Sequence, residues 1–291
     1  MRITNENFAN SPYLFKENDD NSLQLIPHDN DIGGGVITKK EIDILGEFDK
    51  LEYLCISGLK QDTFEYFIQN YARNLRGIVF FKNKLVEDWS LLSTLTNLEY
   101  IFYFHNQRIT KLWDMSNNTN LKGIIIRDFT RLHSLDGIQK AKKLEYFEVG
   151  NAVWDSMVVD SYQYFENSNV QILGFSGKKI EDEDFSFFEK MPKLKQFHSS
   201  LHLLTREQIA WVVSNFPHIN GYSLCSYVPF ENANREAEVF ITGKRMPHLK
   251  QDDPRVKRYD EKFEVLLKKY KGLTYQQLFP KEKSSKEGEK I

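Results

Sequence analysis

Residues 98–121 read LEYIFYFHNQRITKLWDMSNNTNL, and residues 121–144 read LKGIIIRDFTRLHSLDGIQKAKKL. Both stretches begin with the motif L-x-x-L-x-L, whose leucine positions also accept other apolar residues. Eight copies of this motif follow one another, with first positions at residues 51, 75, 98, 121, 144, 170, 194 and 219. A single copy would mean little, but eight copies spaced 23 to 26 residues apart indicate a repeat protein.

The alternation inside the motif predicts one short strand in each repeat, because successive side chains of a strand point to opposite faces. The marked apolar positions, such as Ile101 and Tyr103, should point inward. One coil cannot close a core alone, so neighbouring coils are expected to stack and bury a continuous apolar column. The predicted fold class is an α/β solenoid with a curved parallel concave sheet, a mixed helical and irregular convex side, and caps at both ends.

Two return segments on the convex side are predicted to be helical. The first would be capped by Asp62 and would place Phe64, Phe67, Ile68 and Tyr71 on one face. The second begins at Thr205-Arg-Glu-Gln208, which has the pattern of a capping box. The other returns, such as residues 109–120, are too short and too polar for a long helix.

The repeats resemble the leucine-rich-repeat superfamily, and within it the short-repeat bacterial, internalin-like group. The resemblance covers roughly residues 42–228, and repeats three and four carry it best. The asparagine that usually follows the strand occurs only as Asn83 and Asn106, so an irregular solenoid without a continuous asparagine ladder is expected. The resemblance implies recognition of another protein on the concave sheet.

The segments outside the repeats are expected to be caps and a tail. Residues 1–41 form the N-terminal segment, in which 23–26 suggests one strand over the first repeat. Residues 229–280 form the C-terminal cap, with a strand at 239–241 and a helix that starts at Asp253-Pro254. Residues 281–291 are charged and predicted to be disordered. The glycine run 33–35 lacks the lysine and hydroxyl residue of a phosphate loop.

The repeat register also predicts the residues of the concave face, which lie two, four and six places after each first position. Tyrosine and glycine alternate in the first of these columns through repeat five, which should leave room for each ring to lie over a glycine. Repeats two to five bring six apolar residues and two charged residues to this face: Phe81, Tyr100, Phe102, Phe104, Ile125 and Tyr146, with Arg127 and Glu148 beside them.

A surface of this kind is typical of a partner-binding site, because large exposed apolar patches usually mark interactions. Aromatic residues beside an arginine are also enriched in interface hot spots. The alternative is that the chain's own termini or a second copy of the chain, as a homodimer, cover the patch.

The sequence shows little that suggests catalysis, a metal or a cofactor. His198 and His202 have a metal-ligand spacing for a helix, but they lie in a strand and its exit. Cys55 and Cys225 belong to opposite ends of the stack, so a disulfide between them is not expected. No signal sequence or apolar window of membrane length occurs, and the net charge is −2. These features predict a cytoplasmic, non-enzymatic protein.

The predicted function is therefore that of a protein–protein interaction module, acting as a regulator or neutraliser of its partner. The alternative is nucleic-acid or anionic-surface binding through the C-terminal segment 244–271, in which Lys and Arg outnumber the acids. Salt dependence distinguishes the two, because apolar contacts persist at salt concentrations that weaken phosphate contacts.

Overall fold

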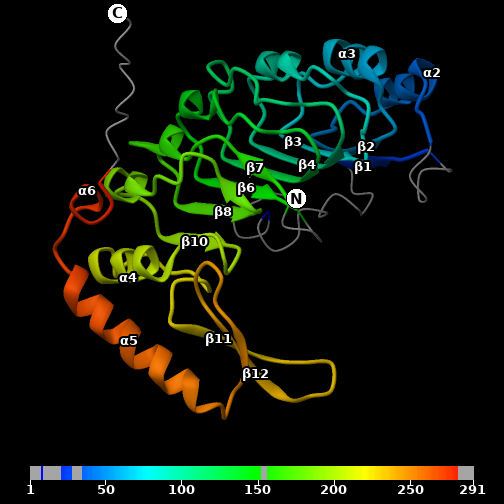
Figure 1. Ribbon diagram of the computed structural model, residues 1–291. Helices are drawn as coiled ribbons and strands as arrows, with labels where there is room; N and C mark the ends of the chain where they lie inside the picture. Colours follow the sequence, from blue (N-terminus) through cyan, green and yellow to red (C-terminus); the bar gives the residue numbers. More distant parts are fainter. Residues whose placement is uncertain (1–7, 9–20, 28–34, 152–155, 281–291) are drawn as a thin grey trace, which may run out of the picture.

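The computed structural model describes residues 8, 21–27, 35–151 and 156–280. Its main feature is an arched parallel sheet of eight strands that follows the course of the repeats (Figure 1). The strands, in spatial order, are β1 (Ser22–Leu25), β2 (Tyr53–Ser57), β3 (Gly77–Phe81), β4 (Tyr100–Asn106), β5 (Gly123–Phe129), β6 (Tyr146–Gly150), β8 (Ile172–Ser176) and β10 (Gln196–Ser199). The predicted α/β leucine-rich-repeat solenoid is confirmed.

The strands pair with equivalent motif positions side by side. Leu54 lies opposite Ile78, Ile78 opposite Ile101, and Ile101 opposite Ile124. These side chains are buried in one core between the sheet and the convex returns. A shift of one residue would turn every side chain to the other face of the sheet, so this pairing confirms the predicted register.

Short helical segments cover the convex side of the arch (Figure 1). They are α2 (Lys39–Ile42), η3 (Asp43–Glu47), α3 (Gln61–Asn70), η4 (Ser90–Thr94), η5 (Ile138–Lys140), η6 (Gln163–Phe165), η7 (Ser186–Lys190) and α4 (Arg206–Asn215), with a two-strand ladder of β7 (Val158–Val159) and β9 (Lys179–Ile180). The capping box at α4 is confirmed, because Thr205 and Gln208 each accept a backbone hydrogen bond from the other. The prediction that Asp62 caps α3 is wrong: Lys60 is the cap residue, and Asp62 lies in the first turn.

The two asparagines that follow strands are buried and hold the turns of neighbouring repeats together. Asn83 accepts a hydrogen bond from the Leu59 amide at 2.8 Å and donates to the Ile56 carbonyl at 3.0 Å. Asn106 donates to the carbonyls of Asn83 and Val86, both at 2.9 Å. At the next equivalent position Phe129 instead packs its ring 5.0 Å from that of Tyr103, so the ladder stops, as predicted.

A ladder of alternating charges crosses the strand-entry edge of the sheet. Arg76 lies between Glu52 at 3.5 Å and Glu99 at 2.8 Å, and Lys122 pairs with Glu99 at 2.8 Å. Burial raises the pKa of Glu99, but the hydrogen bonds from Lys122 and Arg76 more than offset it and leave the pKa below its ordinary value. Each residue directly follows the first position of its repeat, so ion pairs as well as apolar contacts join neighbouring repeats.

The eighth copy of the motif lacks the strand that the other seven contain. Only an isolated bridge between Gln196 and Asn220 continues the sheet there. Tyr222, expected to point inward, is 50% exposed, while Leu224 is buried. A Cβ atom at Gly221 would lie 2.0 Å from the Phe197 carbonyl oxygen, so the backbone passes too close to β10 for a regular strand. The solenoid sheet therefore ends at β10.

The segments at the two ends differ in kind. The predicted strand near residues 23–26 is confirmed as β1, which pairs in parallel with β2. The predicted strand at 239–241 belongs instead to a separate antiparallel sheet of β11 (Tyr227–Glu231), β12 (Ala237–Ile241) and β13 (His248–Lys250). The glycines Gly33 and Gly34 and the tail 281–291 lie outside the described residues.

A buried arginine joins the C-terminal elements to the solenoid. The helix α5 (Pro254–Tyr270), capped by Asp253 as predicted, packs along α4 and is followed by α6 (Tyr275–Leu278) (Figure 1). The Arg206 guanidinium donates to the carbonyls of Ser226 at 3.0 Å and Tyr259 at 2.9 Å. Among the described residues, no helix combines the length and the apolar character needed to cross a bilayer.

Candidate functional site

The residues predicted for the concave face lie together, as the register required. Strand pairing places Tyr100, Gly123 and Tyr146 in one row, Phe102, Ile125 and Glu148 in the next, and Phe104 beside Arg127. The apolar residues among them belong to a cluster separate from the solenoid core, which we call the concave cluster. Its buried members are Phe8, Tyr53, Cys55, Val79, Tyr100, Phe102, Ile125 and Tyr146.

The expectation that the whole patch is exposed is wrong. Tyr100 is only 3% exposed, and Phe102, Ile125 and Tyr146 are also buried. The alternative, coverage by the chain's own terminus, accounts for part of this burial. The ring of Phe8, which is 1% exposed, lies 5.0 Å from the ring of Tyr100 and 5.9 Å from that of Tyr146. Phe8 therefore covers Tyr100 and Tyr146, and all four predicted residues are buried in this structure.

The alternation of tyrosine and glycine explains how a third ring fits there. A Cβ atom at Gly123 would lie 2.8 Å from Cδ1 of Tyr100 and 2.9 Å from Cδ1 of Phe8. The Tyr100 ring thus leans over Gly123, as expected, and the remaining space holds Phe8. Nothing in the local sequence around Phe8 indicated this contact, which joins residues more than ninety positions apart.

We define the aromatic edge as the predicted residues Phe81 and Phe104 together with their chain neighbours Lys82 and His105, which the sequence had not indicated. All four residues are half-buried. The rings of Phe81 and Phe104 stack with centroids 5.5 Å apart and planes 20° from parallel, and the Lys82 ammonium lies 4.9 Å from the Phe81 centroid. A stacked pair with a cation over one ring is suited to contact an apolar or aromatic partner residue.

Lys82 and His105 carry an unusual backbone. Both have positive φ, of 54° and 63°, and so does Asp128 at the equivalent position of the next repeat, with 56°. Non-glycine residues hold this conformation only where the surrounding structure imposes it. Lys82 and His105 are each followed by a buried asparagine, Asn83 or Asn106, whose hydrogen bonds hold the turn, whereas Asp128 is followed by the buried ring of Phe129. No residue pattern predicted this row of turns.

The pKa of His105 is lowered, first by burial and then by the positive charge of Lys84 and Lys82, which exceeds the opposing effect of Asp128. Its imidazole is therefore neutral at pH 7. The ring lies 6.2 Å from that of Phe104. The aromatic edge thus has one fixed positive charge, on Lys82, beside a neutral ring.

Arg127 and Glu148 form an ion pair with each other on the concave face. Tyr146 donates its hydroxyl hydrogen to Glu148 at 2.7 Å. The pKa of Tyr146 is raised, mainly by burial and next by the negative charge of Glu148, so the hydroxyl remains a donor. The predicted polar residues therefore hold the Tyr146 ring in position and form a half-buried polar border to the concave cluster.

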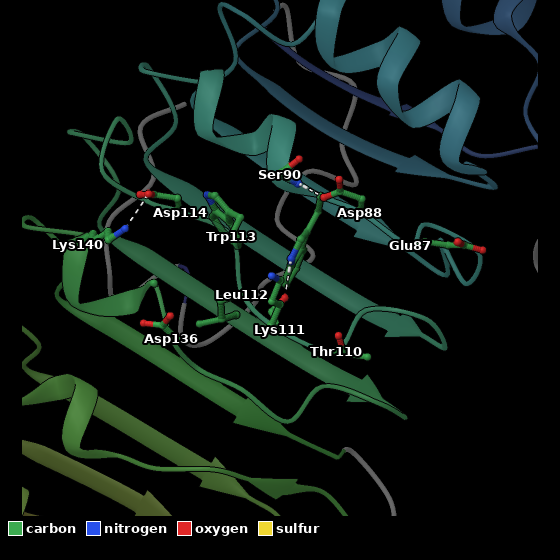
Figure 2. A pocket seen from close by; sticks show the side chains of 12 residues that line it. Glu87, Asp88, Ser90, Thr110, Lys111, Leu112, Trp113, Asp114, Asp136 and Lys140 are labelled. Atoms are coloured by element: carbon green, nitrogen blue, oxygen red, sulfur yellow. Dashed lines mark hydrogen bonds and ion pairs between the residues drawn. The ribbon is translucent and has the colours of Figure 1, made fainter.

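A groove of about 520 Å³ lies on the convex side, between the returns that follow β3, β4 and β5 (Figure 2). Asp114 pairs there with Lys140 at 2.7 Å, and Trp89 donates to the Lys111 carbonyl at 2.9 Å. Asp88 accepts a hydrogen bond from the Ser90 amide at 2.8 Å. These polar groups stabilise the turns of the return segments, so their presence in the groove is explained by the fold and does not indicate a ligand site.

A smaller hollow of about 180 Å³ on α5 is lined by Arg255, Arg258, Tyr259 and Lys262. Arg255 is held by Asp253 at 2.7 Å. Arg258 and Lys262, four residues apart, lie on the same side of the helix. This hollow is the most basic feature of the C-terminal segment that suggested an alternative function.

Comparison with solved structures finds leucine-rich-repeat proteins. An internalin (InlF) from Listeria monocytogenes aligns with 64% of this chain and 62% of its own, at 16% identity and a TM-score of 0.43. The structure of a TLR13–ssRNA13 complex aligns with 64% of this chain and 30% of its own, at 15% identity and a TM-score of 0.46. The structure of the Toll–Spatzle complex of Drosophila aligns with 65% of this chain and 34% of its own, at 14% identity and a TM-score of 0.38.

This chain thus spans less than two thirds of the length of each of these structures. No protein-family model and no curated protein matches the sequence. The likeness concerns the fold, which the strand register and the internal repeats establish independently. The chain folds as a leucine-rich-repeat solenoid.

Proposed function

We propose that this chain binds a partner protein on its concave side and that the aromatic edge is the first point of contact. The observation that carries the proposal is the stacked pair Phe81–Phe104, which is half-buried and has Lys82 over one ring. Aromatic rings beside a cation supply much of the binding energy at protein interfaces. The role is non-catalytic: the chain would regulate or neutralise its partner by occupying it.

The aromatic edge is continuous with the buried part of the face. Phe104 lies 6.4 Å from Phe102, a member of the concave cluster. The ion pair of Arg127 and Glu148 borders the same region. We therefore retain all eight predicted residues as the proposed surface, of which Phe81 and Phe104 are half-buried and four residues are buried, two of them against Phe8.

Quantitative affinity purification from a lysate of the source cells tests this proposal. The wild-type chain is compared with a Phe81→Ala/Phe104→Ala double variant and with Tyr222→Ala as a matched control. Tyr222 is an exposed aromatic residue at the far end of the solenoid. We expect a protein that the wild type and the control retain at 0.5 M salt and that the double variant loses. Equal retention by all three chains would contradict the proposal.

A homodimer is a separate outcome of the same design. If sedimentation of the purified wild-type chain shows a dimer and the double variant is a monomer, the partner is a second copy of the chain. Sedimentation separates the dimer from the monomer by mass, so this experiment needs only the purified chains.

The hollow on α5 supports a second candidate function, the binding of a polyanion such as nucleic acid. Phosphate contacts release counterions, so such binding weakens steeply as salt rises. Arg258→Ala/Lys262→Ala should then weaken binding of a labelled single-stranded oligonucleotide, while the Phe81/Phe104 variant should not. No binding at 50 mM salt would exclude this candidate.

A further inference from the structure

Phe8 occupies a hollow in the concave face that is bounded by one glycine and two tyrosine rings. Gly123 forms its floor, where a Cβ atom would lie 2.9 Å from Cδ1 of the Phe8 ring. Tyr100 and Tyr146 form its walls, with ring centroids 5.0 Å and 5.9 Å from that of Phe8. The Tyr146 ring meets Phe8 nearly edge-on, at 79°, and the Tyr100 ring is tilted by 46°. Both are favourable arrangements for aromatic pairs.

We infer that this hollow is a socket for one aromatic side chain of the binding partner, and that Phe8 occupies it in the free protein as an internal competitor. The inference rests on the proposed function, whose partner it describes further: a peptide segment that carries a Phe, Tyr or Trp residue among polar neighbours. The chain's own segment, NENFANS at residues 5–11, has that composition.

The walls of the socket are held in place without Phe8. The Tyr146 hydroxyl donates to Glu148, which also pairs with Arg127. Tyr100 and Tyr146 each lie opposite Gly123 in the register of the sheet, one on either side. A socket whose walls belong to three hydrogen-bonded strands loses little order when it is empty. Such preorganisation favours binding because few groups must be fixed on association.

Phe8 is also distinct from the core on which the fold depends. It belongs to the concave cluster and not to the core between the sheet and the convex returns. The cluster reaches the aromatic edge through Phe102 and Phe104, whose ring centroids are 6.4 Å apart. A partner that docks on Phe81 and Phe104 therefore meets the socket on the same surface, and it gains access to Tyr100 and Tyr146 when Phe8 leaves.

The test uses the full chain and a probe of known sequence. The probe is a fluorescein-labelled peptide of residues 2–14, RITNENFANSPYL, and its binding is followed by fluorescence anisotropy. The full chain with Phe8→Ala has an empty socket and should bind the peptide saturably. The wild-type chain should bind it at least ten-fold more weakly, because its socket is occupied. A peptide with alanine in place of the phenylalanine should bind neither chain.

Glycine variants locate the binding. In the Phe8→Ala background, Gly123→Ala places a methyl group in the socket and should abolish peptide binding. Gly46→Ala is the matched control, since a Cβ atom there meets only Cε1 of Tyr71 at an ordinary 3.7 Å, and binding should be unchanged. Circular dichroism verifies that each chain is folded at the assay temperature. If Phe8→Ala is unfolded, Phe8→Leu replaces it, and the peptide should displace the leucine.

Two results would overturn the inference: a folded chain with Phe8→Ala or Phe8→Leu that does not bind the peptide, or equal binding to that chain and to the wild type. Neither result depends on finding the partner. Conversely, peptide binding without any partner captured by the Phe81/Phe104 experiment would leave the socket established and contradict the proposed function.

Discussion

The ring of Phe8 lies 5.0 Å from that of Tyr100, although ninety-one residues separate them in the sequence. This contact places Phe8 on the inner side of the arch. It converts a row of outward-pointing rings into a second, smaller apolar cluster. The solenoid therefore has apolar packing on both faces of its sheet, where a simple repeat would have it on one.

Replacing Phe8 by alanine should destabilise the protein measurably. Burial of a phenylalanine side chain contributes about 1.5–3 kcal/mol. For a chain of this size each kcal/mol corresponds to a shift in melting temperature of about 2–4 °C, so we expect a decrease of roughly 3 to 12 °C in calorimetry. Phe48→Ala, which removes an exposed ring, serves as control. An unchanged melting temperature for Phe8→Ala would mean that the contact does not form in solution.

Asn106→Ala should be among the most damaging single substitutions in the repeats. The Asn106 amide donates to two buried carbonyls, and its oxygen accepts hydrogen bonds from the amides of Arg108 and Ile109, both at 2.8 Å. Unsatisfied buried polar groups cost about 1–3 kcal/mol each, so we expect a loss of about 2–4 kcal/mol of unfolding free energy by urea denaturation.

Asn97→Ala is the matched control for this substitution. Asn97 is exposed and donates one hydrogen bond, to the Arg73 carbonyl at 3.1 Å. Water can replace that bond, so its loss should change the unfolding free energy little. Equal effects of the two substitutions would show that the Asn106 turn adds no more than an ordinary surface contact.

The register of the solenoid could be predicted because the local spacing of apolar residues determines it. Apolar residues that alternate within each motif and recur at a regular interval leave one way to stack, and Ile101 and Ile124 lie opposite each other accordingly. The charge ladder of Glu52, Arg76, Glu99 and Lys122 was also visible in the sequence. Each residue directly follows a first motif position, so the repeat spacing alone places these alternating charges side by side.

The coverage of the concave face could not be predicted in the same way. Phe8 has no periodic neighbour and no spacing relation to Tyr100, so its position depends on shape and not on local pattern. Only the glycines between the tyrosines hinted that something would fill the space. The strand predicted for the eighth repeat is absent for a related reason. Its spacing fits the motif, but the close approach of Gly221 to β10 depends on the folded chain and not on the local sequence.

Arg206→Met should loosen the C-terminal elements while leaving the solenoid intact. The buried guanidinium donates to the carbonyls of Ser226, Thr242 and Tyr259. Methionine fills much of the same volume but removes the charged donor that links these three segments, while the Ser226 carbonyl keeps its hydrogen bond from the Thr242 amide. We expect a cost of about 1.5–3 kcal/mol, the usual contribution of a hydrogen bond to a charged group. We expect faster hydrogen exchange in β12 and α5 and unchanged exchange in β3 to β5.

The exposed Arg255, which pairs with Asp253, provides the control. Arg255→Met should leave exchange in β12 unchanged, because the side chain reaches no other element of the described structure. If Arg206→Met and Arg255→Met exchange alike, the buried guanidinium is not what joins α5 to the solenoid.

His105 should make the stability of the aromatic edge depend on pH. Its pKa is lowered in the folded protein, chiefly by burial and then by Lys84 and Lys82, whereas the unfolded chain has the ordinary value of about 6.5. The unfolded state therefore takes up the proton first. Stability is full above pH 6.5 and decreases as the pH falls from there through the folded pKa.

Nuclear magnetic resonance titration of the His105 ring protons measures the shift directly, and its midpoint should lie below 6.5. Lys82→Gln removes one neighbouring positive charge and should move the midpoint upward. Lys122→Gln, on the opposite edge of the sheet, should not. His105→Gln should also flatten the decline in melting temperature between pH 7 and pH 5. A wild-type midpoint at or above 6.5 would show that burial and the neighbouring lysines do not lower the pKa of His105, and would contradict this prediction.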